Sequence, residues 1–387
     1  GIEGKDAEHD ATVYDPDFAP FFVNNFNGSN VENLAIFGQW SSIVGQRAYL
    51  EAGFRSENVD MSTETVDAFP ARLVDMNPAM WAMGTPPRAV FMLREGFNAA
   101  DRSQTNNNLD WVVKGRYQAT DNLVVELGFA QKMRSPIYQE RYLWIPLEAN
   151  AGIGDGNNYV GNPELDPEKS RQIELGFDWV VGDFYFSPRI FHRNVDDYIQ
   201  GIAATNMAVI GVSANANGDL TPLIFANTEA EFSGLDMTFG TRINSNWRVE
   251  GIASMVDGDR EDISDNIYRV APSSVRASLF YEANRFNAKI EQVFVAEQDD
   301  LSRTNTFDSL NPNNSFVKTD GYALTNVYLT WLISDELTIT TGAENLFDED
   351  YSDHLTGFNR VIGSEVSVGS RMLGQGVNFF GRLQYKW

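Results

Sequence analysis

The C-terminal stretch V-N-F-F-G-R-L-Q-Y-K-W, from Val377 to Trp387, alternates apolar and polar side chains and ends on an aromatic residue. Successive side chains of an extended strand point to opposite faces, so this stretch has one apolar and one polar face. The apolar face carries Val377, Phe379, Leu383, Tyr385 and Trp387. The same two-residue rhythm recurs through most of the chain, which predicts an all-β fold of antiparallel strands.

Pairs of such strands flank short polar turns. Residues 111–119 and 123–129 alternate on either side of the turn 120–122, as in an antiparallel hairpin. Further short turns lie near positions 45, 182, 245, 284 and 334, with long polar segments between the hairpins. Consecutive antiparallel strands send successive connections to opposite ends, so the short turns share one end and the long loops the other. We count about thirteen strands and expect residues 1–30 to form a long loop.

The composition and pattern favour a membrane barrel over a soluble β-protein. No stretch approaches the roughly twenty apolar residues of a membrane helix, but a spanning β-barrel exposes only alternate residues to lipid. A soluble propeller would repeat at constant length, whereas only the long loops vary in length here. Aromatic residues make up 12% of the chain, and tryptophans near expected strand ends suit an interfacial girdle. These are Trp111, Trp179, Trp247, Trp331 and Trp387. We therefore predict an antiparallel transmembrane β-barrel with long extracellular loops and short periplasmic turns.

Charge and motif content argue against two other classes of function. The net charge of -25 would repel a phosphate backbone, so we expect no nucleic-acid partner. The three histidines, His9, His192 and His354, are far apart in sequence, and we find no nucleophile motif or phosphate-binding loop. The absence of Cys excludes disulfides and thiolate metal sites. We therefore do not expect an enzyme.

Three stretches resemble the TonB-dependent outer-membrane receptors. They are Y-V-G-N-P-E-L-D-P-E-K-S-R-Q-I-E-L-G-F-D-W from Tyr159 to Trp179, A-E-N-L-F-D-E-D-Y from Ala343 to Tyr351, and the aromatic C-terminal strand. The resemblance implies a barrel of roughly 22 strands in the outer membrane of a Gram-negative bacterium. It also implies an N-terminal plug that contacts the TonB system, and a C-terminal strand that is read by the barrel assembly machinery. We expect residues 1–387 to be the C-terminal part of such a barrel, without the plug and first strands.

A cluster of methionines lies in the longest predicted loop, within V-D-M-N-P-A-M-W-A-M-G from Val74 to Gly84. Met76, Met80 and Met83 are spaced i, i+4 and i+7, which predicts one face of a short helix. Thioether sulfur is a soft ligand that selects Cu(I) over harder ions. The alternative is a loop helix that uses methionine to pack against the barrel mouth.

Other loop residues are candidates for binding cargo. The segment from Glu140 to Tyr159, together with H-L-T-G beginning at His354, resembles the copper branch of the family, and His354 is a candidate fourth copper ligand. A planar anionic siderophore in the barrel mouth could be bound by Arg141, Tyr142 and Trp144; the alternative is that these side chains pack within the loop. We expect no resident cofactor, and copper or an iron chelate as cargo. A passive outer-membrane channel is the alternative from another functional class.

Charged residues on the polar strand faces should line the lumen, because they would be costly in lipid. We expect this set to contact the plug: Lys114, Arg116, Glu126, Glu174, Asp178, Arg248, Glu250, Lys289 and Glu291. The acidic runs 257–262 and 297–300 lie in predicted extracellular loops. They either hold divalent cations that bridge to lipopolysaccharide or form solvated loop tips. Outer-membrane lipid and lipopolysaccharide are therefore the expected surroundings.

Overall fold

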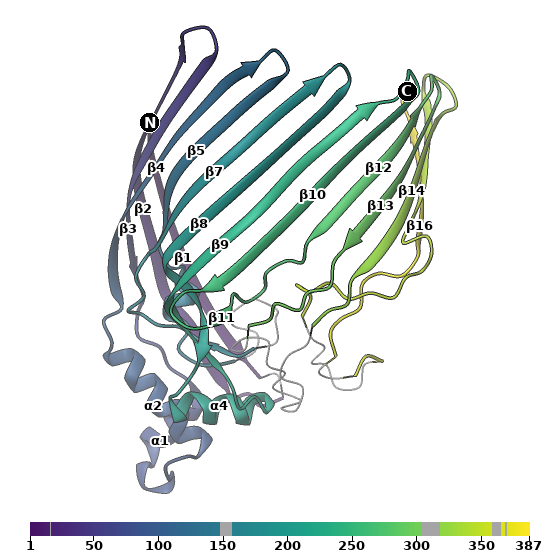
Figure 1. Cartoon of the computed structure of the whole chain (residues 1–387). Coiled ribbons are helices and arrows are strands. Elements are labelled where there is room, and N and C mark those ends of the chain that lie inside the picture. The colour runs from purple at the N-terminus through teal and green to yellow at the C-terminus, as the bar shows by residue number, and fades with distance from the viewer. Residues whose placement is uncertain (16, 148–156, 303–317, 358–364, 368–369) are drawn as a thin grey trace.

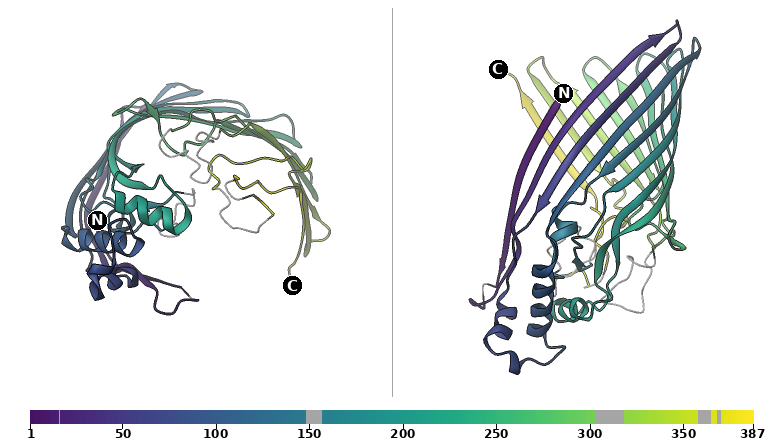
Figure 2. Two further views of the ribbon diagram at one scale, coloured as in Figure 1. Left: turned by 90° about the horizontal axis from the view of Figure 1, so that it is seen from below. Right: turned by 90° about the vertical axis from the view of Figure 1, so that its left-hand side faces the viewer.

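One curved antiparallel sheet dominates the structure, a computed structural model that describes residues 1–387 except 16, 148–156, 303–317, 358–364 and 368–369 (Figure 1). Among the described residues the sheet has 16 strands. Seen along its axis it forms an arc with an opening between β1 and β16, and the helices lie on the concave side (Figure 2). We call the concave side the inner face and the convex side the outer face.

Fourteen of the strands follow one another across the sheet in sequence order. They are β1 (Ile2–Tyr14), β2 (Phe22–Val44), β3 (Ala48–Ser62), β4 (Ser103–Thr120), β5 (Leu123–Arg134), β7 (Glu168–Val181), β8 (Phe184–Ala203), β9 (Leu223–Arg242), β10 (Trp247–Arg260), β12 (Ser274–Glu282), β13 (Phe286–Val295), β14 (Tyr322–Leu332), β15 (Leu337–Glu344) and β16 (Asn378–Tyr385). Two short strands lie off this path: β6 (Tyr159–Val160), which pairs with β9, and β11 (Asp265–Asn266), which pairs with β10.

The connections confirm the predicted asymmetry. Short turns join β2 to β3, β4 to β5, β7 to β8, β9 to β10, β12 to β13 and β14 to β15, and Figure 1 shows them together at one end, the turn end. Two of these turns contain a glycine at positive φ, Gly45 at 65° and Gly182 at 59°, a backbone conformation that other residues adopt at a cost. The long connections gather at the opposite end, the loop end.

The N-terminal prediction was wrong. Residues 1–30 form β1 and the start of β2 rather than a long loop, so the count of about thirteen strands was low by one strand of the main path. β1 is an edge strand of the sheet. Its outward-facing positions near the loop end include Asp6 and Glu8 instead of apolar residues, so the alternation along β1 does not separate apolar from polar side chains. The cross-strand ladder between β1 and β2 runs from Ile2 to Tyr14 with register shifts on both sides of Ala11, and this pairing, not the hydrophobic pattern, defines the strand.

The outer face carries an aromatic belt at the turn end. The rings of Trp247 and Tyr281 lie 4.9 Å apart, those of Tyr281 and Phe286 6.2 Å apart, and those of Phe286 and Trp331 6.5 Å apart. Trp179 continues the belt on β7. The prediction for Trp111 was wrong, because β4 begins at residue 103 and places Trp111 in mid-strand.

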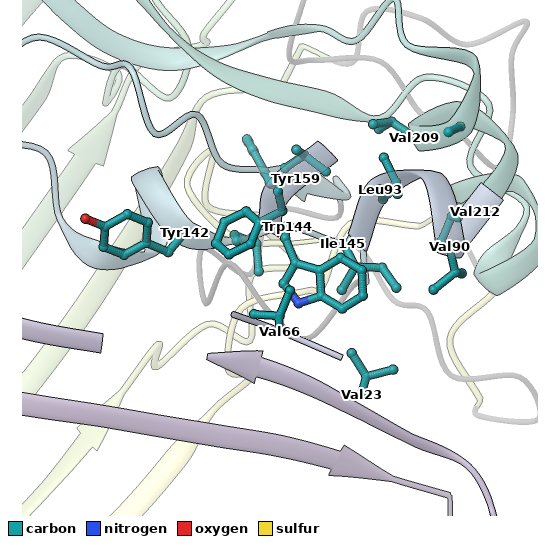
Figure 3. Packing of buried hydrophobic residues seen from close by; sticks show 14 of the residues in the cluster. Val23, Val66, Val90, Leu93, Tyr142, Trp144, Ile145, Tyr159, Val209 and Val212 are labelled. Carbon is teal, nitrogen blue, oxygen red and sulfur yellow. The ribbon is translucent and has the colours of Figure 1, made fainter. Parts of the chain in front are cut away.

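Loops and helices form a second layer inside the arc at the loop end. The helices are α1 (Phe69–Met76), the 3-10 helix η1 (Pro78–Met80), α2 (Pro86–Ala99), α3 (Tyr138–Tyr142) and α4 (Met207–Asn217). None of the helices in the described part of the chain is long and apolar enough to cross a membrane. The apolar sides of α1, α2, α3 and α4 meet in one core that also takes residues from β2 and β6, as Figure 3 shows for Val23, Val90, Tyr142, Tyr159 and Val209.

Candidate functional site

The three methionines predicted to bind metal lie at the exposed tip of the α1–α2 hairpin, at the loop end (Figure 1). Met76, Met80 and Met83 are 78%, 67% and 70% exposed. They do not share one helix face as predicted, because α1 ends at Met76 and a separate 3-10 turn begins at Pro78. Proline disfavours helical geometry in the residue before it, and Asn77 has φ -150° and ψ 75°. The tip is therefore a bent segment with three exposed thioethers.

A buried arginine holds this hairpin in shape. Arg94 of α2 donates to both carboxylate oxygens of Asp75 at 2.8 and 2.9 Å, and to Asp67 at 2.9 Å. The bidentate hydrogen bonds from Arg94 lower the pKa of Asp75, which immediately precedes Met76. The indole of Trp81 donates to the carbonyl oxygen of Leu73 at 3.1 Å. The tip is thus fixed at its base on both sides.

Arg141, Tyr142 and Trp144, the proposed siderophore residues, lie inside the loop layer. They are 1%, 1% and 3% exposed, and Figure 3 shows Tyr142 and Trp144 among the buried hydrophobic residues. The Tyr142 hydroxyl donates to the carbonyl oxygens of Met61 and Arg102, and the Trp144 indole donates to that of Asn24. In this conformation their side chains make the contacts of packing residues, so ligand binding by them stays a prediction. Residues 148–156 of the same segment lie outside the described residues.

The G-N-P motif explains why Arg141 is buried. Arg141 donates to the carbonyl oxygens of Pro163 at 3.0 Å and Leu165 at 2.7 Å. The amide of Asn162 donates to the carbonyl oxygen of Glu140 at 2.8 Å. A Cβ on Gly161 would lie 2.8 Å from backbone atoms of Arg141, so only glycine fits this approach. The motif and α3 therefore form one locked unit.

His354 lies in the connection between β15 and β16, which runs along the other side of the arc from α1 (Figure 2). Its Nδ1 lies 3.0 Å from the hydroxyl of Thr319. Burial, with a smaller contribution from the positive charge of Arg371, lowers the pKa of His354 to about 4. The ring is therefore neutral at pH 7, as a metal ligand requires, but the arrangement does not bring it to the methionine tip. The described residues contain no group of three or more His, Asp or Glu side chains arranged for a metal ion.

The predicted lumen charges line the inner face, and those on β4, β5 and β7 pair across strands. Lys114 lies 2.6 Å and Arg116 3.3 Å from Glu126, which is buried. Arg116 also lies 2.9 Å from Asp178. Arg189, which the sequence analysis missed, lies 2.7 Å from Asp178. Its alternation on β8 places it on the polar face, so the strand pattern contained that signal. Contact of this network with a plug stays a prediction.

The family model described as TonB dependent receptor-like, beta-barrel matches residues 4–346. The chain belongs to this family. Members are outer-membrane proteins of Gram-negative bacteria, so the outer aromatic belt faces the membrane, the turn end is periplasmic and the loop end is extracellular. The inner face of this TonB-dependent receptor barrel is accordingly the lumen wall.

Individual relatives are distant. The chain is similar to the vitamin B12 transporter BtuB of Photobacterium profundum, with 20% identity over 252 residues that cover 65% of this chain and 36% of the relative. Among solved structures it is similar to the copper transporter OprC, with a TM-score of 0.73 and 17% identity over 99% of this chain and 53% of that one. The FrpB iron transporter of Neisseria meningitidis gives a TM-score of 0.61 and 13% identity over 94% and 46%. These identities show the fold alone, and the chain spans about a third to a half of the relatives it matches.

Proposed function

We propose that this chain forms the C-terminal barrel part of an outer-membrane receptor that takes up copper by TonB-dependent active transport. In this proposal a plug outside the present chain contacts the TonB system, and the lumen-wall charges bind that plug. The fold likeness to OprC, named as a copper transporter, supports copper among the possible cargoes. The curated relative named as a vitamin B12 transporter supports active uptake in general.

The exposed methionine tip is the observation that carries the choice of copper. Met76, Met80 and Met83 are each more than 60% exposed, although methionine is among the residues most often buried in proteins. A loop that used them for packing would bury them. Three thioethers in an exposed tip instead offer a soft donor set, and such donors prefer Cu(I). The buried Arg94 keeps the tip in place.

The test is copper accumulation in cells whose only receptor of this kind is the full-length protein. We expect accumulation from low-copper medium to depend on TonB. Replacing Met76, Met80 and Met83 together by Leu should lower it to about the level of a TonB deletion, because leucine keeps the volume but removes the sulfur ligands. Unchanged accumulation in the triple variant would exclude the tip as the copper site.

A matched control uses two methionines on the lipid-facing side of the barrel. Met237→Leu together with Met255→Leu changes the same side chains on β9 and β10, and should leave accumulation unchanged. Parallel assays with a ferric siderophore separate the two cargo classes. If the cells take up siderophore iron in a TonB-dependent way but take up no copper, the proposed cargo becomes the siderophore instead of copper. Uptake of copper or of siderophore iron that does not depend on TonB would favour a passive channel.

A further inference from the structure

A hollow of about 480 Å³ lies on the lumen wall beneath α3, away from the methionine tip. The first four strands form its floor, and residues 134–138 form its edge toward the loops. Lys5, Asn33 and Val59 lie opposite one another on β1, β2 and β3, so their side chains share one face. The volume is within the range of pockets that bind small organic molecules.

The floor is apolar and the rim is polar. Ala7, Val31, Val59 and Met61 supply carbon and sulfur surface, while Lys5, His9, Asn33, Glu57 and Asn108 surround it. This arrangement, an apolar base with a few convergent polar groups, is typical of a site for an organic ligand. The amide and carboxylate oxygens of this rim are hard donors, unlike the three exposed thioethers of the tip.

Two amide oxygens on this rim lack partners among the described residues. Asn108 is 4% exposed; its Nδ2 donates to the Ser135 hydroxyl at 2.9 Å, and its Oδ1 has no hydrogen bond. Asn33 donates weakly to Glu57 at 3.4 Å, and its Oδ1 is also unpartnered. Buried polar atoms are almost always hydrogen-bonded, so each such atom calls for a donor. A bound molecule with hydroxyl groups would supply those donors.

The remaining rim groups indicate a negative charge on the same molecule. Lys5 forms no ion pair within the described part of the chain, so its ammonium is available. Glu57 is already paired with Arg55 at 2.9 Å, which offsets its repulsion of an anion. The ring of His9 stacks on Tyr138, with ring centroids 4.1 Å apart and planes 10° apart, and stiffens the loop-side edge.

We propose that this hollow binds a hydroxy acid. The hydroxyl groups of the ligand donate to the side-chain oxygens of Asn33 and Asn108, and its carboxylate pairs with the ammonium of Lys5. The carbon chain of the ligand packs against Val59 and Met61. The proposal concerns a different site from the methionine tip, and its test does not use copper. Its outcome and that of the copper proposal are therefore independent.

The test is binding of gluconate to the purified full-length receptor in detergent, measured by calorimetry and by saturation-transfer NMR. Gluconate should bind, while glucose, which lacks the carboxylate, and hexanoate, which lacks the hydroxyls, should bind roughly tenfold more weakly or not at all. Lys5→Met, at an exposed position, should reduce gluconate binding to the level of glucose. Asn108→Leu should weaken gluconate binding by roughly tenfold, because it removes one acceptor while keeping similar volume.

The sequence supplies a neighbouring control. Asn107 precedes Asn108 on β4 but points to the outer face, where it is exposed and accepts from Asn58 at 3.3 Å. Asn107→Leu should leave gluconate binding unchanged. No gluconate binding at millimolar concentration would overturn the proposal, as would equal binding by the Asn108→Leu and Asn107→Leu variants. A structure of the full-length receptor with only ordered water, or another part of the chain, on the two amide oxygens would also overturn it.

Discussion

Gly161 makes the tightest backbone approach in the G-N-P motif. Its added Cβ would meet the carbonyl group of Arg141 and the amide of Leu143, all at 2.8 Å. Backbone atoms in a hydrogen-bonded turn cannot move aside as a flexible side chain can. We expect Gly161→Ala to destabilise the loop layer by about 1–3 kcal/mol, the usual range for overpacking. Hydrogen exchange of the amides in residues 137–147 should accelerate accordingly.

The matched control is Gly96, which lies inside α2 of the same loop layer. No atom lies within 4 Å of its added Cβ. Alanine at this position should stabilise α2 by about 0.5–1 kcal/mol, because glycine is unfavourable inside a helix. Faster exchange in both variants, or in neither, would contradict the steric argument for Gly161.

At the residue scale, the sequence identified polar and apolar faces but not burial within loops. The sequence suggested a ligand-binding site at the barrel mouth from the residue types of Arg141, Tyr142 and Trp144. Each of these side chains instead donates to a main-chain carbonyl oxygen and is nearly fully buried. Burial of a loop depends on what packs over it, here α2 and α4, which are far away in sequence. No local pattern contains that information. The bend at Pro78, in contrast, was missed although the sequence contains its signal, a proline that disfavours helical geometry at Asn77.

At the scale of elements, the connection between β15 and β16 is anchored in its described residues by a set of hydrogen bonds. Asn345, at φ 47°, is buried; its side-chain amide donates to the carbonyl oxygens of Glu349 and Gln375, and its Oδ1 accepts from the amide of Glu349. Arg371 donates to the carbonyl oxygens of His354 and Thr356. The E-N-L-F-D motif that suggested the family is therefore a structural corner in this chain.

The anchoring of this connection should weaken in acid. The pKa of His354 is lowered to about 4 in the folded loop, with Arg371, Asp353 and Arg269 as the charges nearby. The unfolded loop takes up a proton near pH 6.5, whereas the folded loop resists it, so stability is full above pH 6.5 and falls as the pH drops toward 4. The protection of the amides in residues 351–357, measured relative to the intrinsic exchange rate at each pH, should fall across that range.

His354→Gln provides the comparison for that experiment. Glutamine does not titrate but can still hydrogen-bond to the hydroxyl of Thr319. The protection of these amides, measured relative to the intrinsic exchange rate, should change much less between pH 6.5 and 4 in this variant. Identical pH profiles in the two proteins would assign the effect to neighbouring carboxylates instead.

At the scale of the whole molecule, the arrangement of strands was largely predictable because one physical requirement repeats. Every lipid-facing position must be apolar and every lumen-facing position is free to be polar, so the two-residue pattern persists through most strands. The pattern failed at β1, where Asp6 and Glu8 lie on the outward face near the loop end. The predicted start of a strand near Trp111 was also wrong, because β4 begins at residue 103.

The assigned faces can be tested directly. Leu127 lies on the outer face of β5 and is 42% exposed, while Val112 lies on the inner face of β4. Leu127→Arg should cost about 2–4 kcal/mol near the bilayer midplane and reduce the folded receptor in outer membranes. Val112→Arg, facing the wet lumen, should assemble normally. Heat-modifiable gel mobility measures the folded fraction, and equal assembly of both variants would refute the assignment of faces.

The sequential order of the main strands has a consequence for assembly. From β1 to β16 each strand of that path pairs with the next one along it, apart from the small excursions of β6 and β11. Six of the thirteen neighbouring pairs on this path are hairpin partners joined by a few residues, for which the entropy of loop closure is small. The wall can grow one hairpin at a time, and each finished hairpin presents an edge in the correct register to the next. The slow step should then be the ordering of the extracellular layer, whose core joins segments from β2 to β9.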